Sequence, residues 1–280
     1  MRAILLFSCQ DQHGIVYEIS KFIVENSGNI VDLDEHVDTD QNMFFIRVAW
    51  EMENINEMDL SNKFEPLAQK FKAKWKLEFP NKTPKMAIFV SKYDHALQEI
   101  LWRNKIGEFN SEIVAIVSNN IDMQDLAKNY NIPYYHFPIT KINKEQQELE
   151  EIQLLKELNV DIIVLARYMQ ILSSNFVNNF PNQIINIHHS FLPAFIGSNP
   201  YKQAFERGVK MIGATSHFVT NNLDEGPIIA QDIARINHKD TIKDLIRKGR
   251  DLERLVLSSA VRLFLEHRVL VYKGKTIVFE

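Results

Sequence analysis

The chain has 280 residues, of which 45% are hydrophobic and 24% charged, the composition of an ordinary globular protein. Nine glycines and nine prolines are too few for a collagen-like or disordered chain, and a formal net charge of −4 gives no electrostatic footprint for nucleic acid. The single cysteine, Cys9, rules out a disulfide within the chain and fits a reducing compartment. Apolar runs fall short of the about 20 residues of a membrane span and the ~7–15 of a secretory signal, so we expect a cytoplasmic protein with no membrane or nucleic-acid partner.

Residues 1–80 carry the hydrophobic pattern of a small βαββαβ unit. The pattern predicts strands at 3–8, 30–37, 43–50 and 74–79, one helix that begins at Ile15, and another at 57–71. This order is typical of a ferredoxin-like sandwich, in which two helices cover one face of an antiparallel sheet. Residues 81–84 follow Pro80 and end at Pro84. Two prolines this close together disfavour both a helix and a central strand, so we predict a linker here.

Beyond the linker, residues 85–280 alternate between short apolar runs and helical segments. Strands buried on both faces are predicted at 86–90, 113–117 and 162–166, and helices at 95–104, 144–158 and 241–266. Such alternation is typical of an open α/β sheet that is mostly parallel. We expect the mixed charges of 239–254 to form a solvated helix face, and the chain to end in a hairpin around Gly274.

Three patches of the second block combine amide, imidazole and carboxylate groups. Asn186 and His188 alternate with Ile187, so they share one face of a predicted strand, and His189 should diverge from His188 if the strand continues. Thr215 and His217 share a face of a second strand, and Asp224 lies on a loop before a third. We expect these patches at the carboxyl edge of the sheet, where open α/β proteins bind ligands.

These residue types suit acyl chemistry. An amide can donate to a developing oxyanion, and histidine with aspartate can move a proton. Taken singly, each residue could equally satisfy backbone groups in a turn. A metal held by two histidines and Asp224 is a minor alternative, because His188 and His189 should diverge, so we expect no metal and no cofactor. Cys9 near His13 is better explained as a small buried hydrophobe than as a nucleophile.

The second block resembles the folate-dependent formyltransferase family. The matching residues follow the family's order: Asn186-Ile187-His188, Ser190, Leu192-Pro193, Gly197, His217-Phe218-Val219 and Leu223-Asp224-Glu225-Gly226-Pro227-Ile228-Ile229. The resemblance is closer still, over nearly the whole chain, to the formyltetrahydrofolate deformylase branch, whose version of the motif spans 188–197. It implies a formyltransferase fold for 85–280. Residues 9–15 and 28–30 resemble an ACT domain, which implies a regulatory, oligomer-forming unit for 1–80.

The activity implied by this resemblance is hydrolysis of 10-formyltetrahydrofolate to formate and tetrahydrofolate, which balances one-carbon pools and supplies formate for purine synthesis. The catalytic residues would be Asn186, His188 and Asp224, with no cofactor. Substrate would be bound by Tyr168, Met169, Gln170, Ile171 and Leu172, together with Thr215 and His217.

One departure from the family bears on the acceptor of the formyl group. Relatives that formylate a phosphorylated amine hold its phosphate in a glycine-rich turn after the first catalytic strand. Here that turn would be Ser91-Lys92-Tyr93-Asp94-His95, which contains no glycine, and this favours water as the acceptor. Transfer to an amine remains an alternative, as does a non-catalytic ACT amino-acid sensor, against which the intact Asn–His–Asp set argues.

The ACT resemblance further implies a small-molecule effector and self-association. Glycine or methionine is the expected effector, bound near Asp11, His13, Gly14 and Asn29. Asp11 could meet an amino group, or it could cap the helix that begins at Ile15. We expect a homo-oligomer, because an exposed edge strand is otherwise a liability.

Overall fold

The computed structural model describes residues 1–53, 56–194 and 200–280, which form two compact units. The first unit comprises Met1–Thr83 with Glu266–Leu270 and Ile277–Glu280, and the second comprises Pro84–Leu265 with Val271–Thr276. The sequence prediction assigned the whole of 85–280 to the second block, whereas the structure places two C-terminal stretches with the first unit. Gly197 of the formyltransferase-like motif lies outside the described residues.

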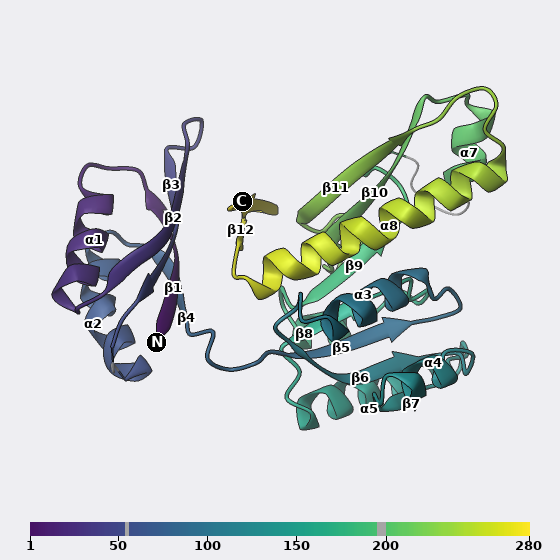
Figure 1. Ribbon diagram of the computed structural model, residues 1–280, viewed down its shortest axis with the longest axis horizontal. Coiled ribbons are helices and arrows are strands. Elements are labelled where there is room, and N and C mark those ends of the chain that lie inside the picture. The colour runs from purple at the N-terminus through teal and green to yellow at the C-terminus, as the bar shows by residue number, and fades with distance from the viewer. Residues whose placement is uncertain (54–55, 195–199) are drawn as a thin grey trace. The chain divides into compact units, whose positions relative to one another are not determined.

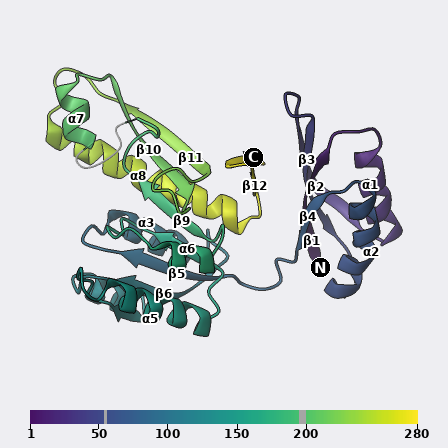
Figure 2. The same ribbon diagram turned by 180° about the vertical axis from the view of Figure 1, so that it is seen from behind.

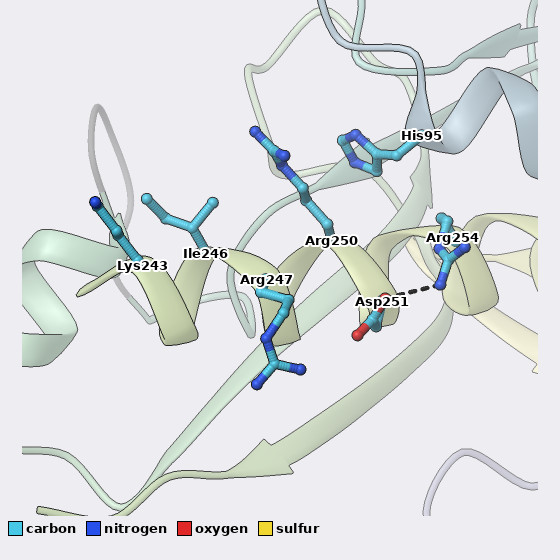
Figure 3. Close-up of a pocket in the computed structure, with 7 residues that line it drawn as sticks. All are labelled: His95, Lys243, Ile246, Arg247, Arg250, Asp251 and Arg254. Carbon is cyan, nitrogen blue, oxygen red and sulfur yellow. Dashed lines mark hydrogen bonds and ion pairs between the residues drawn. The ribbon is translucent and has the colours of Figure 1, made fainter. Parts of the chain in front are cut away.

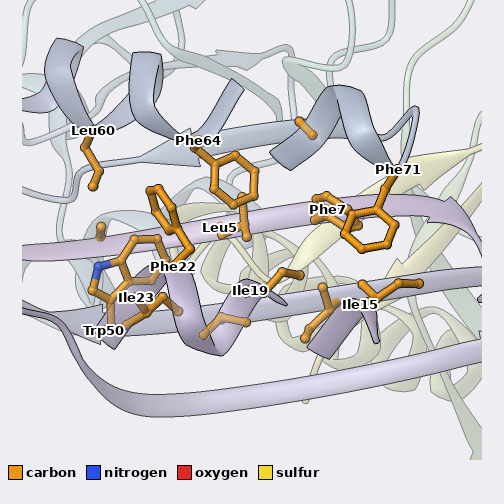
Figure 4. Packing of buried hydrophobic residues seen from close by; sticks show 14 of the residues in the cluster. Leu5, Phe7, Ile15, Ile19, Phe22, Ile23, Trp50, Leu60, Phe64 and Phe71 are labelled. Carbon is orange, nitrogen blue, oxygen red and sulfur yellow. The ribbon is translucent and has the colours of Figure 1, made fainter. Parts of the chain in front are cut away.

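The first unit is a four-stranded antiparallel sheet with two helices, in the βαββαβ order expected from the sequence (Figure 1). Its strand order is β2-β3-β1-β4. The elements are β1 (Arg2–Gln10), α1 (Ile15–Glu25), β2 (Asn29–Asp38), β3 (Met43–Glu51), α2 (Glu57–Lys70) and β4 (Lys74–Glu78). Apolar side chains of β1 and β3 meet those of α1 and α2 in one core, where Phe64 packs edge-on against Phe7 and Phe22 (Figure 4). Burial of this apolar surface is the main stabilising contribution.

The other face of β3 explains why the C-terminal stretches belong to the first unit. Arg47 lies there and is only 2% exposed, so its guanidinium must be fully paired. Its Nη1 lies 2.5 Å from Asp32 Oδ2, and it donates to the backbone carbonyls of Glu266 and His267 at 3.1 and 2.9 Å. The chain that follows the last helix is therefore anchored on this sheet.

The second unit is built on a seven-stranded sheet of order β11-β10-β9-β8-β5-β6-β7. Its strands are β5 (Lys85–Val90), β6 (Glu112–Ser118), β7 (Tyr134–His136), β8 (Ile162–Leu165), β9 (Ile184–His188), β10 (Met211–Phe218) and β11 (Ile228–Arg235). Neighbours from β9 to β7 are parallel, while β10 runs antiparallel to β9 and β11 antiparallel to β10. The predicted mostly parallel α/β sheet is confirmed, and the two antiparallel edge strands refine it.

Helices cover both faces of this sheet (Figures 1 and 2). Alternate residues of β5 point to opposite faces: Ala87 and Phe89 join the core formed with α5 (Lys144–Glu157) and α6 (Ser174–Asn179). On the other face α3 (His95–Lys105) packs against α8 (Ile242–Leu265). The remaining elements are α4 (Gln124–Asn129), α7 (Pro200–Glu206) and the hairpin of β12 (Val269–Tyr272) and β13 (Lys275–Val278). No helix in the described part of the chain is long and apolar enough to cross a membrane.

Candidate active site

The second unit contains a cavity of about 600 Å³ beyond the carboxyl ends of β5, β8 and β9. The chain leaves β5 toward β6 on one side and later leaves β8 toward β9 on the other, so the cavity lies at a topological switch point of the sheet. The segment predicted to bind substrate follows β8, and all of its residues line the cavity: Tyr168, Met169, Gln170, Ile171 and Leu172.

The end of β9 positions the amide and the first imidazole. Asn186 and His188 both line the cavity, and in the antiparallel ladder they lie opposite His217 and Thr215 of β10. The divergence of His188 and His189 is expected only if the strand continues, and that condition is not met, because β9 ends at His188 and strand alternation ends with it. Their rings instead stack, with centroids 5.0 Å apart and planes inclined by 27°.

The loop between β10 and β11 brings the carboxylate to this imidazole. Asp224 Oδ1 lies 3.2 Å from His188 Nδ1. Asp224 has a φ of 57°, a left-handed conformation that costs energy for a residue with a side chain. The loop can fold back this closely because residue 226 is glycine: a Cβ there would lie 1.7 Å from the Phe218 carbonyl oxygen.

Three neighbouring groups have shifted protonation equilibria. The pKa of Asp224 is lowered, chiefly by the hydrogen bond from His188, so this carboxyl is ionised at neutral pH. Burial lowers the pKa of His217, and burial with the Arg167 charge lowers that of His189 to about 4. Both of these imidazoles are therefore neutral at neutral pH.

The tautomer of His217 follows from its contacts. Its Nδ1 lies 2.9 Å from the Phe218 carbonyl oxygen, which can only accept, so Nδ1 carries the proton. The Nε2 atom is then an acceptor, and it receives a hydrogen bond from Asn186 Nδ2 at 3.3 Å. His217 thereby holds the Asn186 amide in place, and its own lone pair makes it a poor donor to Asp224, 3.8 Å away.

His188 is left with an unpartnered ring nitrogen beside the cavity. Its Nδ1 faces Asp224, while its Nε2 is buried and has no hydrogen-bond partner among the described residues. A buried polar atom without a partner is costly unless a ligand or water satisfies it. An amide, a carboxylate and an imidazole with an unused nitrogen can together polarise a carbonyl and move a proton. Within the described parts of the chain, no group of three or more His, Cys, Asp or Glu could hold a metal ion.

Thr215 departs from its predicted substrate-binding role. It is fully buried and is not among the residues that line the cavity. Its Oγ1 donates to the Ser190 carbonyl at 2.8 Å and accepts from Leu192 N and Gln231 Nε2 at 3.0 and 2.9 Å. Thr215 thus fixes the chain that follows β9. It also supports His188, which lies opposite it in the antiparallel ladder.

A second carboxylate of the cavity, Glu253 of α8, was not among the predicted site residues. It is 1% exposed, accepts from Tyr201 Oη at 2.6 Å, lies 2.7 Å from His95 Nε2, and has Arg167 Nε 3.4 Å away. The prediction of a solvated face for 239–254 is wrong at this position. The missed signal was an acid in register with Val256 and Leu257 on the apolar face of the helix.

The side chains around Glu253 lower its pKa, and two backbone features accompany this arrangement. Burial alone would raise the pKa of Glu253, but the His95 hydrogen bond, the Arg167 charge and the Tyr201 hydrogen bond outweigh it and keep the pKa low. Gly249 admits Tyr201, whose Oη would lie 2.0 Å from a Cβ there. Arg167 adopts a φ of 64°, a strained backbone of the kind that clusters at functional sites.

The predicted effector residues do not come together within one chain. Asn29 lies opposite Glu51 at one end of β3, whereas Gln10, next to Asp11, lies opposite Met43 at the other end. The cause is α1, which carries the chain back along the sheet before β2 begins. Asp11 does not cap α1, because Gly14 is the N-cap residue and no side chain caps this helix.

A model of the formyl transferase family matches residues 84–261. The chain belongs to the formyl transferase family. A family member from Synechocystis, named formyltetrahydrofolate deformylase, is 51% identical over 100% of this chain and 99% of its own length. The crystal structure of a formyltetrahydrofolate deformylase from Pseudomonas syringae matches with a TM-score of 0.97 at 38% identity, covering 100% of this chain and 95% of that one.

The similarity to a transformylase structure covers only part of this chain. The structure of glycinamide ribonucleotide transformylase 1 from Symbiobacterium toebii matches with a TM-score of 0.67 at 30% identity. That match covers 71% of this chain and 95% of the transformylase chain. The full-length similarity is therefore to relatives named as deformylases, and the similarity to a transformylase is partial.

Proposed function

We propose that this protein hydrolyses 10-formyltetrahydrofolate to formate and tetrahydrofolate. The observation that carries the proposal is the convergence of Asn186, His188 and Asp224 on one cavity, in a chain that matches relatives named formyltetrahydrofolate deformylase over its full length. The segment 168–172 is proposed to bind the pterin ring, because it lines the same cavity on the side of β8.

In the proposed mechanism the ionised Asp224 orients a water molecule and takes its proton as the oxygen attacks the formyl carbon. In this proposal His188 starts as the charged imidazolium, and the Asn186 amide and the His188 Nε2–H donate to the oxyanion of the tetrahedral intermediate. The N10 atom cannot leave as an anion, so it takes a proton from His188 as the C–N bond breaks. Formic acid leaves and ionises to formate, Asp224 releases its proton to water, and His188 takes up a proton from water at Nε2, which restores the starting state.

Water is favoured over an amine acceptor by the Glu253 end of the cavity. His95, Tyr201 and Arg167 already surround this carboxylate, so an incoming ammonium group would have to compete with them for it. The turn after β5 contains no glycine, so side chains such as Tyr93 stand where a backbone cradle for phosphate would be needed. Transfer to an amine acceptor remains the second candidate, supported by the partial similarity to a transformylase.

The decisive experiment supplies purified protein with 10-formyltetrahydrofolate alone and measures formate and tetrahydrofolate. We expect equal amounts of both products without added metal and in the presence of a chelator. The same assay with glycinamide ribonucleotide added serves as the comparison. Product that forms only when the amine is present would overturn the hydrolase and support the transferase.

The first unit is proposed to be an ACT domain that regulates the enzyme and joins it into a homo-oligomer in the cytoplasm. Its βαββαβ order and β2-β3-β1-β4 sheet support this assignment. We propose glycine or methionine as the effector and the turn of Asp11, His13 and Gly14 as its binding element. Titration calorimetry with both amino acids, repeated on Asp11→Ala, tests this. Absence of heat and of any change in turnover would leave assembly as the role of the unit.

A further inference from the structure

Two walls of the active-site cavity are built in different ways. On the side of α8, the side chains of Ile246 and Arg250 reach the cavity directly, next to His95 (Figure 3). On the side of β8 the wall is the irregular segment 168–172, and no residue of the fully described helix α5 lines the cavity. An irregular segment lacks the regular hydrogen bonds of a helix or strand, so other groups must hold its backbone in one conformation.

Ser91, in the turn after β5, holds the start of this segment. Its Oγ accepts a hydrogen bond from Met169 N at 2.9 Å and donates one to Asn119 Oδ1 at 2.6 Å. Because the hydroxyl proton is directed at Asn119, a lone pair of the same oxygen is available to the Met169 N–H. Ser91 is buried and belongs to the turn that contains no glycine, so one side chain of this turn serves to fix the segment.

Two side chains of α5 hold the end of the segment. Glu148 Oε1 accepts a hydrogen bond from Ser173 N at 3.1 Å, and Lys144 Nζ donates to the carbonyl oxygen of Ile171. Lys144 Nζ lies 3.9 Å from Glu148 Oε1, so opposite charges meet beside the backbone that they hold. Glu148 is only 3% exposed, and burial of a carboxylate costs free energy that burial of an apolar side chain does not. Folding alone therefore does not favour a glutamate at this position.

The backbone groups that remain open alternate with those that are held. The N–H and C=O groups of Gln170 and Leu172 form no hydrogen bond with the described residues, and both residues line the cavity. The side chains of Met169 and Ile171 are more than half exposed, so apolar packing contributes little to fixing the segment. Open donors and acceptors in fixed positions suit a planar ring that carries donors and acceptors of its own.

We propose that Ser91, Lys144 and Glu148 are positioning residues that preorganise segment 168–172 for the pterin ring of the folate substrate. They hold alternate backbone groups and leave the groups between them for the ligand. The conformational entropy of the segment is then lost on folding and not on binding, which strengthens binding. The identity of the ring rests on the proposed function.

The first test is Glu148→Ala, which removes the acceptor of the Ser173 N–H. We expect KM for 10-formyltetrahydrofolate to rise about tenfold and kcat to fall by about threefold or less, because the catalytic residues lie on other elements. Glu148→Gln keeps an oxygen that can accept this hydrogen bond, so its KM should stay within about twofold of the parent value. The matched control is Glu145→Ala, an exposed acid in the first turn of the same helix, which should leave both constants unchanged.

The second test measures binding without turnover, by titration calorimetry with tetrahydrofolate. Glu148→Ala and Ser91→Ala, which act at opposite ends of the segment, should each raise the Kd about tenfold, whereas Glu148→Gln should not. This pattern supports the positioning role even if the protein releases no formate, in which case the proposed function alone fails. The positioning role is overturned if tetrahydrofolate does not bind the parent, if both alanine variants keep the parent Kd and KM, or if Glu148→Gln weakens binding as much as Glu148→Ala.

Discussion

The two carboxylates of the active-site cavity, Asp224 and Glu253, have opposite surroundings. Asp224 stands on a strained loop. Among the described residues its one close partner is the Nδ1 of His188, whose other ring nitrogen has no partner there. Glu253 stands in the middle of a 24-residue helix, almost fully buried, and three side chains surround it. The Nε2 of the imidazole beside Asp224 is thus left open, whereas Glu253 is enclosed by polar and charged side chains. Chemistry is expected at the open end and rigidity at the closed end.

The sharpest test of this contrast is Asp224→Asn. We expect turnover to fall by about 10²–10⁴-fold, because the amide cannot accept the proton of water, while the fold persists. Steady-state formate release measures the loss, and circular dichroism checks that the structure remains. Turnover within a few-fold of the parent would remove Asp224 from the mechanism.

Asn186→Ala should have the next largest effect. Losing one oxyanion donor costs roughly 10²–10³-fold in kcat where this has been measured. Because that donor acts mainly in the transition state, KM should change little. A raised KM with unchanged kcat would instead make Asn186 a group that positions the substrate.

At the closed end, Glu253→Gln should affect stability more than chemistry. The amide keeps a hydrogen bond to Tyr201 but loses its charge beside Arg167 and His95, and breaking a buried ion pair costs about 3–5 kcal/mol of unfolding free energy. We expect kcat to fall about tenfold or less, through altered packing near Arg167. Urea unfolding and formate release, compared with Asp224→Asn, measure the two effects. A loss of kcat as large as that of Asp224→Asn would break the contrast.

A third carboxyl, that of Glu151 in α5, can be compared with these two. Its substitution is expected to have the smallest effect on activity. It is buried, lies 3.3 Å from Tyr168 Oη, and has an Oε2 without a described partner. Burial raises its pKa to about 8. The folded state therefore holds a proton that the unfolded state has lost between about pH 4.5 and pH 8, so stability falls as pH rises through this window.

Glu151→Gln should remove this pH dependence. We expect the unfolding free energies of parent and variant to converge at low pH, and the variant to be the more stable above pH 8 by on the order of a few kcal/mol, with turnover nearly unchanged. Urea titrations at pH 6 and pH 8.5 measure it. Parallel pH profiles for the two proteins would show that the carboxyl is ionised throughout.

Much of the fold could be predicted because it is encoded locally. The mainly apolar runs at 3–8, 43–50 and 86–90 lie inside observed strands, and the run at 162–166 extends one residue beyond β8. The short elements α4, β7, α6 and α7 were not predicted. At three to seven residues, they carry too little periodicity and are held mainly by packing.

The candidate site divides in the same way. Asn186, His188 and Asp224 could be identified from the sequence because their residue types and order carry the chemistry, and the structure brings them to one cavity. Three other features could not be predicted from the sequence. These are the direction of His189, the supporting role of Thr215 and the separation of Asp11 from Asn29. Each depends on where a strand ends or a helix returns, which local pattern does not report.

The sequence by itself determined the order of helices and strands, the division near residue 83 and the residue types that can act on a formyl group. Only the tertiary structure decided which residues close one end of the cavity. These are Glu253, His95, Arg167 and Tyr201, and the first two lie 158 residues apart in the sequence. The tertiary structure also decided that Arg47 anchors the residues after α8. The physical reason is that buried charges must find partners wherever the folded chain supplies them, and those partners are set by packing in space and not by spacing along the chain.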